Sequence, residues 1–296
     1  MVGLGVIMQP NLASSLLRKR VRALARHLSG ALAAEAEPVH EVRVASRRLR
    51  AMLPILARKA KGRRVRRVAR TLQLLVRVAG RVRDLDVGVA LFDEHLARRG
   101  SASADTALLR GRLLAARGRA RRRMRQDLGS LDLAGLQSDL RSILSRGPRS
   151  PRAVVRRLAR AVGRAGAALM RSIVGVADRF DPPTLHAVRR QVRRLHYITD
   201  VAADVRRESS DAMRRLKLVQ ETLGVIHDSW VLAGWLGLQA ASARRQGRSS
   251  LESAATTLRE ELVDLARGLH RAYLLAGPAD AVRTALHAVS LGDTAA

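Results

Sequence analysis

The chain has 296 residues, of which 56 are Lys or Arg and 25 are Asp or Glu, so its formal net charge is +31. Hydrophobic residues make up 47% of it, which is too many for a disordered basic tail and enough for a sizeable core. A compact body with this charge repels itself, so we expect a polyanionic partner: nucleic acid, an anionic membrane surface or an inorganic phosphate polymer. The lack of cysteine excludes disulfides, thiolate metal sites and a cysteine nucleophile.

Other features of the composition narrow the function further. No run of about 18 apolar residues occurs, so the sequence predicts no membrane-spanning helix. Only 2 Phe, 2 Tyr and 2 Trp are present, whereas proteins that bind single-stranded nucleic acid stack bases on aromatic side chains. Recognition of bases is therefore disfavoured, while recognition of phosphate is not affected. The lack of cysteine also fits a reducing compartment, so we expect a cytoplasmic location.

The whole chain has the pattern of helices. Ala, Leu, Arg and Glu are abundant, apolar residues recur at helical spacing, and strand-like alternation is absent. Glycine and proline mark the expected ends of the helices. These breaks fall at residues 30–38, 61–62, 98–103, 129–132, 147–151, 178–183, 207–211, 246–250 and 276–278. The sequence therefore predicts an all-α protein.

The two halves of the chain resemble each other. The pattern His-x-x-Arg-x-x-x-Arg-Arg-Leu begins at His40 and again at His186, at an offset of 146 residues. A later pair of segments, which end in Gly-x-x-(Arg/His)-Asp at Asp84 and Asp228, aligns at an offset of 144 residues. Two ordered matches at nearly one offset indicate a tandem duplication. We therefore expect one helical bundle over residues 1–148 and a second over residues 149–296.

The repeated motif places basic side chains along one side of a helix. At about 100° per residue, the four residues of the first copy fall within about 80° of one another, beside an apolar stripe that can pack in a bundle. The first row consists of His40, Arg43, Arg47 and Arg50, and the second of His186, Arg189, Arg193 and His196. Prolines just before each histidine place it in or near a first turn, where backbone N–H groups and the helix dipole favour an anion.

Arginine rows of this kind suit a chain of phosphates. Guanidinium is a planar fork that holds phosphate oxygens in pairs and stays charged at any relevant pH. Arginines at i, i+4 and i+7 recur roughly every 5 to 10 Å along a helix axis, because the rise is about 1.5 Å per residue. The simpler interpretation is that any helix of an arginine-rich protein shows such spacings. Its repetition with the histidine retained favours a binding site.

The doubled motif, followed each time by Gly-x-x-(Arg/His)-Asp, resembles the CHAD family, the conserved histidine α-helical domain, over about residues 11–290. The resemblance implies two bundles of the four-helix type that are related by pseudo-twofold symmetry. It also implies a basic groove or pore between them that binds inorganic polyphosphate without catalysis, at polyphosphate granules. On this basis we expect no enzymatic activity, no catalytic residues, no cofactor and no metal.

The expected polyphosphate-binding residues come from the motif copies and from basic residues near them. The first half contributes His40, Arg43, Arg47, Arg48, Arg50, Arg70 and Arg83. The second half contributes His186, Arg189, Arg190, Arg193, Arg194, Arg214, Lys217 and His227. His196 replaces Arg50 in the second copy, so that end of the site is expected to hold phosphate more weakly. Val44 stands where the second copy has Arg190.

Some interpretations stay open at this point. Asp84 and Asp228 either orient nearby arginines or, as we prefer, form helix caps or structural ion pairs. A cluster from Arg63 to Arg70 either extends the groove or is a solvated face. Metal binding at His40 and His186 is disfavoured, because arginines three and seven residues later repel a cation. The alternative functions are nonspecific binding to the phosphate backbone of nucleic acid, and an enzyme acting on phosphate esters or polyphosphate.

Overall fold

A computed structural model describes residues 12–100, 103–146, 150–176, 179–206 and 211–290 of the chain. Within those ranges it contains ten helices and no strand, which confirms the all-α prediction. The helices are α1 (Leu12–Leu32), α2 (Ala36–Leu56), α3 (Arg63–Arg99), α4 (Ala104–Gly129), α5 (Leu133–Ser145), α6 (Pro151–Val174), α7 (Pro182–Arg206), α8 (Asp211–Arg245), α9 (Ser249–Leu275) and α10 (Pro278–Ser290).

The breaks predicted at residues 30–38, 61–62, 129–132, 246–250 and 276–278 coincide with connections between helices, and the other four include residues outside the described ranges. After α3, Gly100 adopts a left-handed φ of 67° and its N–H donates to the carbonyl of Leu96, as a C-terminal cap does. The side chain of Ser103 then accepts from the N–H of Thr106 in a capping box that starts α4. Local sequence chemistry therefore sets where these helices begin and end.

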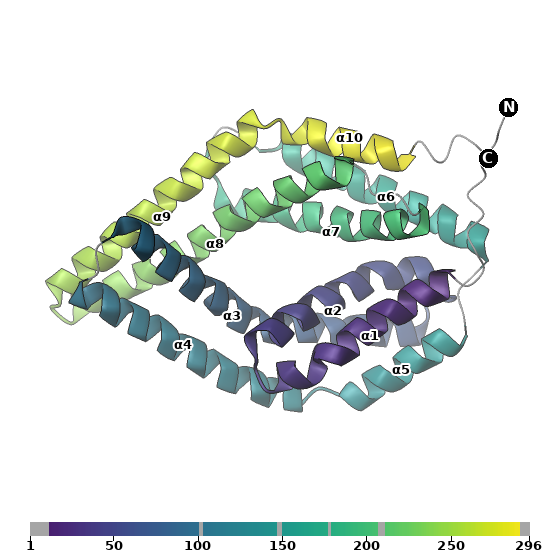
Figure 1. The fold of residues 1–296 in the computed structure, drawn as a ribbon, viewed down its shortest axis with the longest axis horizontal. Helices are drawn as coiled ribbons and strands as arrows, with labels where there is room; N and C mark the ends of the chain where they lie inside the picture. Colours follow the sequence, from purple (N-terminus) through teal and green to yellow (C-terminus); the bar gives the residue numbers. More distant parts are fainter. Residues whose placement is uncertain (1–11, 101–102, 147–149, 177–178, 207–210, 291–296) are drawn as a thin grey trace.

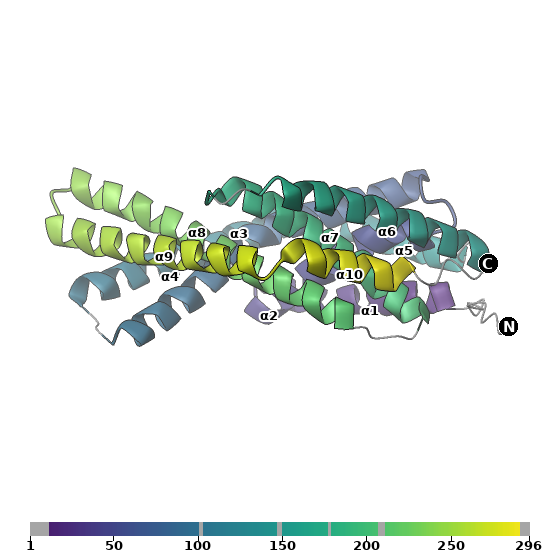
Figure 2. The ribbon, with the colours of Figure 1, turned by 90° about the horizontal axis from the view of Figure 1, so that it is seen from above.

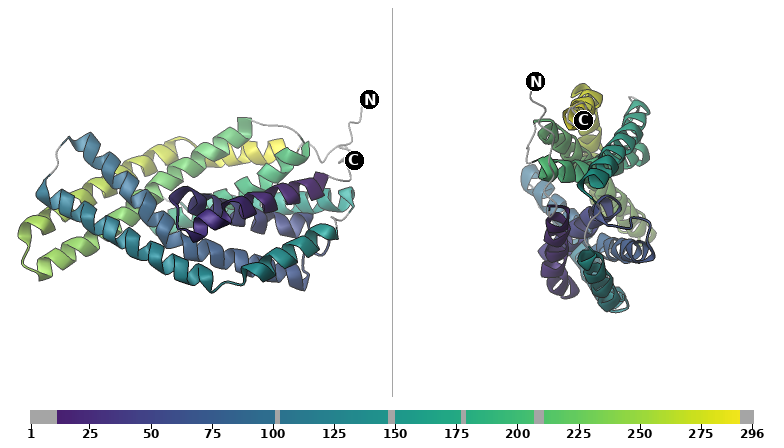
Figure 3. Two further views of the ribbon diagram at one scale, coloured as in Figure 1. Left: turned by 60° about the horizontal axis from the view of Figure 1, so that its bottom comes forward. Right: turned by 90° about the vertical axis from the view of Figure 1, so that its right-hand side faces the viewer.

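The helices form two four-helix bundles, one from each half of the chain. The first consists of α1, α2, α5 and the first half of α3, and the second of α6, α7, α10 and the first half of α8 (Figure 1). Viewed end-on, the two bundles lie against each other, one above the other (Figure 3). The predicted pair of four-helix bundles is confirmed, and α2 and α7, which carry the repeated motif, contact each other between the bundles.

A third bundle extends from this pair and was not predicted. It consists of α4, α9 and the second halves of α3 and α8, which project away from the first two bundles (Figure 2). Its apolar core takes residues from both halves of the chain, such as Phe92 and Leu109 of the first half and Leu236 and Leu258 of the second. The expected boundary near residue 148 falls on residues 147–149, which lie outside the described ranges.

Burial fixes the rotation of the two motif helices. On α2 the side chains of Leu49 and Leu53 have no exposed surface, and on α7 the same holds for Val188 and Leu195. Burying one such side chain contributes about 1.5–3 kcal/mol, so the apolar stripe determines which way the neighbouring basic row points. These residues belong to one apolar cluster that spans both bundles. Among the described helices, none is long and apolar enough to cross a membrane.

Candidate anion-binding site

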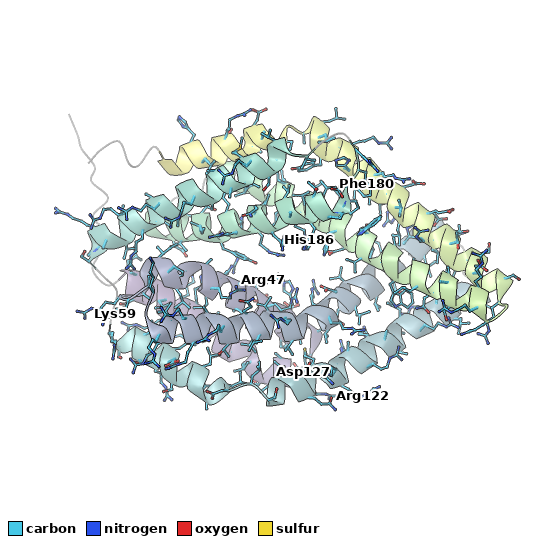
Figure 4. All side chains as sticks on the ribbon, turned by 180° about the vertical axis from the view of Figure 1, so that it is seen from behind. Arg47, Lys59, Arg122, Asp127, Phe180 and His186 are labelled. Carbon is cyan, nitrogen blue, oxygen red and sulfur yellow. The ribbon has the colours of Figure 1, made fainter. Side chains whose placement is uncertain are left out.

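The two motif histidines occupy equivalent places on α2 and α7. His40 is the fifth residue of α2 and His186 the fifth of α7, and both are partly exposed. Figure 4 shows Arg47 on α2 and His186 on α7 along the strip where the two bundles face each other. The N–H of Val39 already donates to the carbonyl of Glu35 at 3.0 Å. At the histidine itself α2 therefore offers an imidazole ring and not a free first-turn N–H.

The side chain of Arg43, a residue of α2, is held in a defined position against α3. Only 8% of this residue is exposed. Its Nη1 donates to the carbonyl oxygen of Val76 at 3.1 Å, and its Nη2 lies 3.9 Å from Oδ1 of Asp84. A Cβ atom on Gly80 would lie 2.8 Å from that Nη1, closer than real Cβ contacts allow. The glycine of the Gly-x-x-Arg-Asp motif is thus explained by the space that the guanidinium of Arg43 needs.

The second repeat reproduces this arrangement with more space. Nη2 of Arg189 lies 3.8 Å from Oδ1 of Asp228. A Cβ atom on Gly224 would lie 3.8 Å from the same Nη2, an ordinary van der Waals distance. The arginine of α7 therefore pairs with α8 as the arginine of α2 pairs with α3. This equivalence supports the expected pseudo-twofold relation of the two bundles at the level of single side chains.

The arginines of the two rows affect one another across the bundles. Burial, followed by the charge of Arg47, lowers the pKa of Arg43 to about 10, and Arg189 of the other repeat contributes. Burial, followed by the charges of Arg47 and Arg189, lowers the pKa of Arg193 to about 10. With a pKa of about 10, Arg43 and Arg193 remain charged at neutral pH. The rows of α2 and α7 therefore form one crowded positive region, which an anion between them would stabilise.

Three histidines in this region favour the neutral form. Nδ1 of His186 lies 3.0 Å from Nδ1 of His227, and the ring centroids are 4.3 Å apart. Burial, followed by the charge of Arg189, lowers the pKa of His227 to about 3. Burial, followed by the charge of Arg190, lowers the pKa of His186. Burial, followed by Arg83, lowers the pKa of His40. In the neutral His186–His227 pair one ring donates its N–H to the Nδ1 of the other, so the second ring keeps its Nε2–H for an oxygen, as neutral His40 keeps its own N–H.

The two aspartates lie in mid-helix, so they are not helix caps. Asp84 and Asp228 each pair with the buried arginine of their own repeat, so the ion-pair interpretation and the orienting interpretation describe the same contact. Burial raises the pKa of Asp228, whereas Arg189 opposes that shift. Both carboxylates lie beside the arginines and leave a surplus of positive charge.

Not all of the predicted residues lie in this region. Arg48 points to the other repeat, where its Nη2 lies 3.6 Å from Oδ2 of Asp200 and its guanidinium lies 5.9 Å from the ring centroid of Tyr197. Arg50 and Arg194 line a separate cavity between α2, α6 and α7. Lys217 is exposed and lies 3.5 Å from Glu221. The remaining three predicted residues, Arg70, Arg190 and Arg214, are exposed. The charge of Arg190 also lowers the pKa of His186.

The basic cluster at the start of α3 is mostly structural. Nε and Nη2 of Arg67 donate to the carboxylate of Asp139 at 2.8 and 2.7 Å, and Arg64 lies 3.6 Å from the same group. These contacts attach α5 to α3, so the predicted extension of the groove along this cluster is not supported at Arg64 and Arg67. No group of three or more potential metal ligands occurs among the described residues.

Sequence reasoning missed two features of the region. The first is the hydrogen bond that the carbonyl of Val76 accepts from Arg43. In the sequence, only the recurrence of the motif glycine together with the motif arginine indicated that contact. The arginines Arg157, Arg160 and Arg164 line the separate cavity. Their spacing of three and four residues on α6 places them on one face of the helix, a signal that the sequence contains.

Comparison with known proteins agrees with this geometry. Among solved structures, the chain is similar to PptA from Streptomyces chartreusis, with a TM-score of 0.69 at 18% identity over 90% of this chain and 99% of that one. It is also similar to the CHAD domain from the plant Ricinus communis, with a TM-score of 0.62 at 20% identity over 97% of this chain and 94% of that one. No match is found among curated proteins. The model of the CHAD domain matches residues 15–237, and the chain therefore belongs to the CHAD domain family.

Proposed function

We propose that this protein binds inorganic polyphosphate, without catalysis, along the positive region between α2 and α7. The observation that carries the proposal is the convergence of the two repeats. Arg43 and Arg47 of α2 lie near enough to Arg189 and Arg193 of α7 for each row to lower the pKa of an arginine in the other. Packing like charges together costs free energy, and a bound polyanion offsets that cost.

The shape of the region favours a chain of phosphates. The part of the row from His40 to Arg47 that lies in this region extends about 10 Å along α2, since the rise is about 1.5 Å per residue. The parallel row on α7 provides a second set of guanidinium forks beside it. A flexible polymer can contact successive forks on both rows, whereas a single phosphate fills only one. The neutral histidines add N–H donors without adding further like charge.

The chain offers few aromatic faces for the reading of bases: Trp230 is 39% exposed beside Phe180, whereas three other aromatic side chains are buried. Phe92 and Tyr273 are 2% and 3% exposed, and Tyr197 is 9% exposed beneath Arg48. None of these three rings offers a face on which a base can stack. Nonspecific binding of a duplex through its phosphates remains the alternative function. It differs in geometry, because duplex phosphates are held on a rigid helical surface, whereas a single flexible chain can follow both arginine rows.

The proposed cellular setting follows from the proposed ligand. A protein that binds long polyphosphate and does not consume it is expected to collect where the polymer collects, at polyphosphate granules in the cytoplasm. Incubation of the purified protein with polyphosphate should release no orthophosphate. Release that survives extensive purification and disappears in His40→Ala would instead indicate an enzyme.

The proposal is tested by competition between long-chain polyphosphate and duplex DNA of matched charge at physiological salt. We expect a clear preference for polyphosphate, and equal affinity for both would contradict the proposal. Steep loss of binding with salt is expected for either ligand, because both release counterions. The variant Arg47→Ala/Arg193→Ala should lose most of the polyphosphate affinity. The matched control Arg122→Ala/Arg125→Ala removes two exposed arginines from α4, and Arg122 lies far from the strip (Figure 4).

A further inference from the structure

A cavity of about 770 Å³ opens beside the strip, between α6, α7, the end of α2 and the turn that leads to α3. Its size falls within the range of small-molecule sites. The side chains that line it are unusual in charge: seven are cationic, and no Asp or Glu is among the described lining residues. Lys59 marks its position at one end of the molecule in Figure 4.

The cations of the cavity come from four elements and are mostly unpaired. Of the three arginines on one face of α6, Arg157 donates to the carbonyls of Ile55 and Ala57 at 3.3 and 2.8 Å and so caps the end of α2. The other two, Arg160 and Arg164, are exposed and form no ion pair with a described residue. The rest are Lys59 and Lys61 of the turn, Arg50 of α2 and Arg194 of α7.

The pseudo-twofold relation provides an internal reference, because an equivalent interface lies between α1, α2 and α7. That interface is neutralised by two carboxylates of α7. Asp200 lies 3.6 Å from Arg48 of α2 and 3.5 Å from His196. Asp204 accepts from Arg20 of α1 at 3.0 Å.

At the offset of 146 residues, Pro54, which lines the cavity, stands in the place of Asp200, and Arg58 of the following turn stands in the place of Asp204. The same framework therefore holds two carboxylates on one side, whereas the described residues that line the cavity include none. Since Arg194 is the equivalent of Arg48, a guanidinium that is paired in one interface faces an open cationic cavity in the other.

We propose that this cavity is a second anion site, which binds a compact oligophosphate group in place of the two missing carboxylates. Four of the seven cations, Arg160, Arg164, Lys59 and Lys61, belong to neither motif row, so the site can be tested separately from the strip between α2 and α7. A triphosphate group matches the chemistry, because it gathers several negative charges within the reach of forks that approach from three helices. Free inorganic oligophosphate and the end of a longer chain share that chemistry.

Inorganic tripolyphosphate is the probe for this site, measured by calorimetric titration of the full chain. In Arg160→Ala/Arg164→Ala its affinity should fall by about tenfold or more. The matched control is Arg152→Ala/Arg156→Ala, which removes two exposed arginines from the same helix outside the cavity and should bind normally. Equal losses in the two variants would overturn the proposal, because they would show a general effect of charge.

The equivalent interface between α1, α2 and α7 suggests a second variant. Pro54→Asp gives the cavity the carboxylate that Asp200 provides on the other side, and it should weaken tripolyphosphate binding, while Pro54→Ala should keep it. Equal affinities of the two variants would overturn the proposal. Tripolyphosphate binding that is lost only in Arg47→Ala/Arg193→Ala would also overturn it, since the probe would then occupy the strip. Failure of long-chain binding alone would instead contradict the proposed function and leave this site in place.

Discussion

The two repeats build the same arginine frame but complete it differently. In each, an arginine of the motif helix pairs with an aspartate of the next helix, at 3.9 Å for Arg43–Asp84 and 3.8 Å for Arg189–Asp228. The residue before the aspartate is Arg83 in the first repeat and His227 in the second. The first repeat therefore adds a fixed positive charge, whereas the second adds a neutral ring in contact with His186.

This difference separates what the framework needs from what tunes it. The arginine, the glycine that gives it room and the aspartate are retained in both halves, so they define the frame. The remaining position sets how much charge faces the ligand. We infer that the first repeat supplies constant attraction, and that the second supplies attraction that depends on pH. The predictions below test this contrast.

The largest effect is expected at the buried arginine of the first repeat. Arg43→Ala removes a guanidinium that is 8% exposed and bonded to a backbone carbonyl. A hydrogen bond to a charged group contributes about 1.5–3 kcal/mol, so the free energy of unfolding should fall by about that amount, and loss of the positive charge should weaken polyphosphate binding about tenfold or more. Arg189→Ala should cost less, because Arg189 has no comparable backbone contact and is more exposed. Circular dichroism and titration of both variants check this, and equal losses would remove the proposed asymmetry.

The second repeat should make binding depend on pH. In the free protein the pKa of His227 is about 3, because the ring is buried near Arg189, His186 and Arg193. A bound phosphate favours the imidazolium and raises that pKa, so as pH falls from 7.5 to 4.5, still above the pKa in the free protein, the complex gains a proton and affinity should increase. His227→Gln should flatten this dependence, which titrations at both pH values would measure. Arg83→Gln is the control, and it should weaken binding equally at the two pH values.

The same histidine should lower the stability of the free protein in acid. The pKa of His227 is about 3 in the folded chain and about 6.5 in the unfolded chain. Below pH 6.5 the unfolded state takes up a proton that the folded state does not, so the melting temperature should fall as pH decreases. The fall should be smaller in His227→Gln and smaller in the presence of polyphosphate. An identical acid profile for wild type and variant would contradict the buried neutral ring.

The smallest effect is expected at the two motif glycines. An added Cβ would lie 2.8 Å from Arg43 at Gly80 but 3.8 Å from Arg189 at Gly224. Gly80→Ala should therefore shift the guanidinium of Arg43 and weaken polyphosphate binding a few-fold, while Gly224→Ala should leave binding unchanged. Both substitutions favour the helix by about 0.5–1 kcal/mol, so neither should lower the melting temperature through helix propensity. Equal affinities of the two variants would show that Gly80 does not set the position of Arg43.

The sequence predicted more of the fold than of the site. Helix ends such as Gly100 and Ser103 follow local chemistry, so they could be predicted without tertiary information. The duplication revealed the two bundles because motif spacing is a property of the chain itself. The third bundle could not be predicted, because its core joins residues such as Phe92 and Leu236 that lie in different repeats.

The candidate site residues also divide into those that the sequence could predict and those that it could not. Arg43, Arg47, Arg189 and Arg193 were found because they repeat with helical spacing beside a buried stripe. Arg48 was assigned to phosphate because it is part of the repeated motif, but its partner is Asp200 of the other repeat. Nothing local in the sequence distinguishes an arginine that pairs across an interface from one that faces a ligand. That distinction depends on which helix lies opposite.

The proposed function requires that the two arginine rows form one binding region. A double-mutant cycle of Arg47→Ala and Arg193→Ala, with long-chain polyphosphate affinity as the readout, tests this claim most directly. Residues that share one ligand and one another's field are expected to show a coupling energy of about 0.5–3 kcal/mol. We predict a single isotherm for each variant and clear non-additivity in the double variant. Two independent isotherms with additive losses would show that the repeats bind separately and would contradict the account.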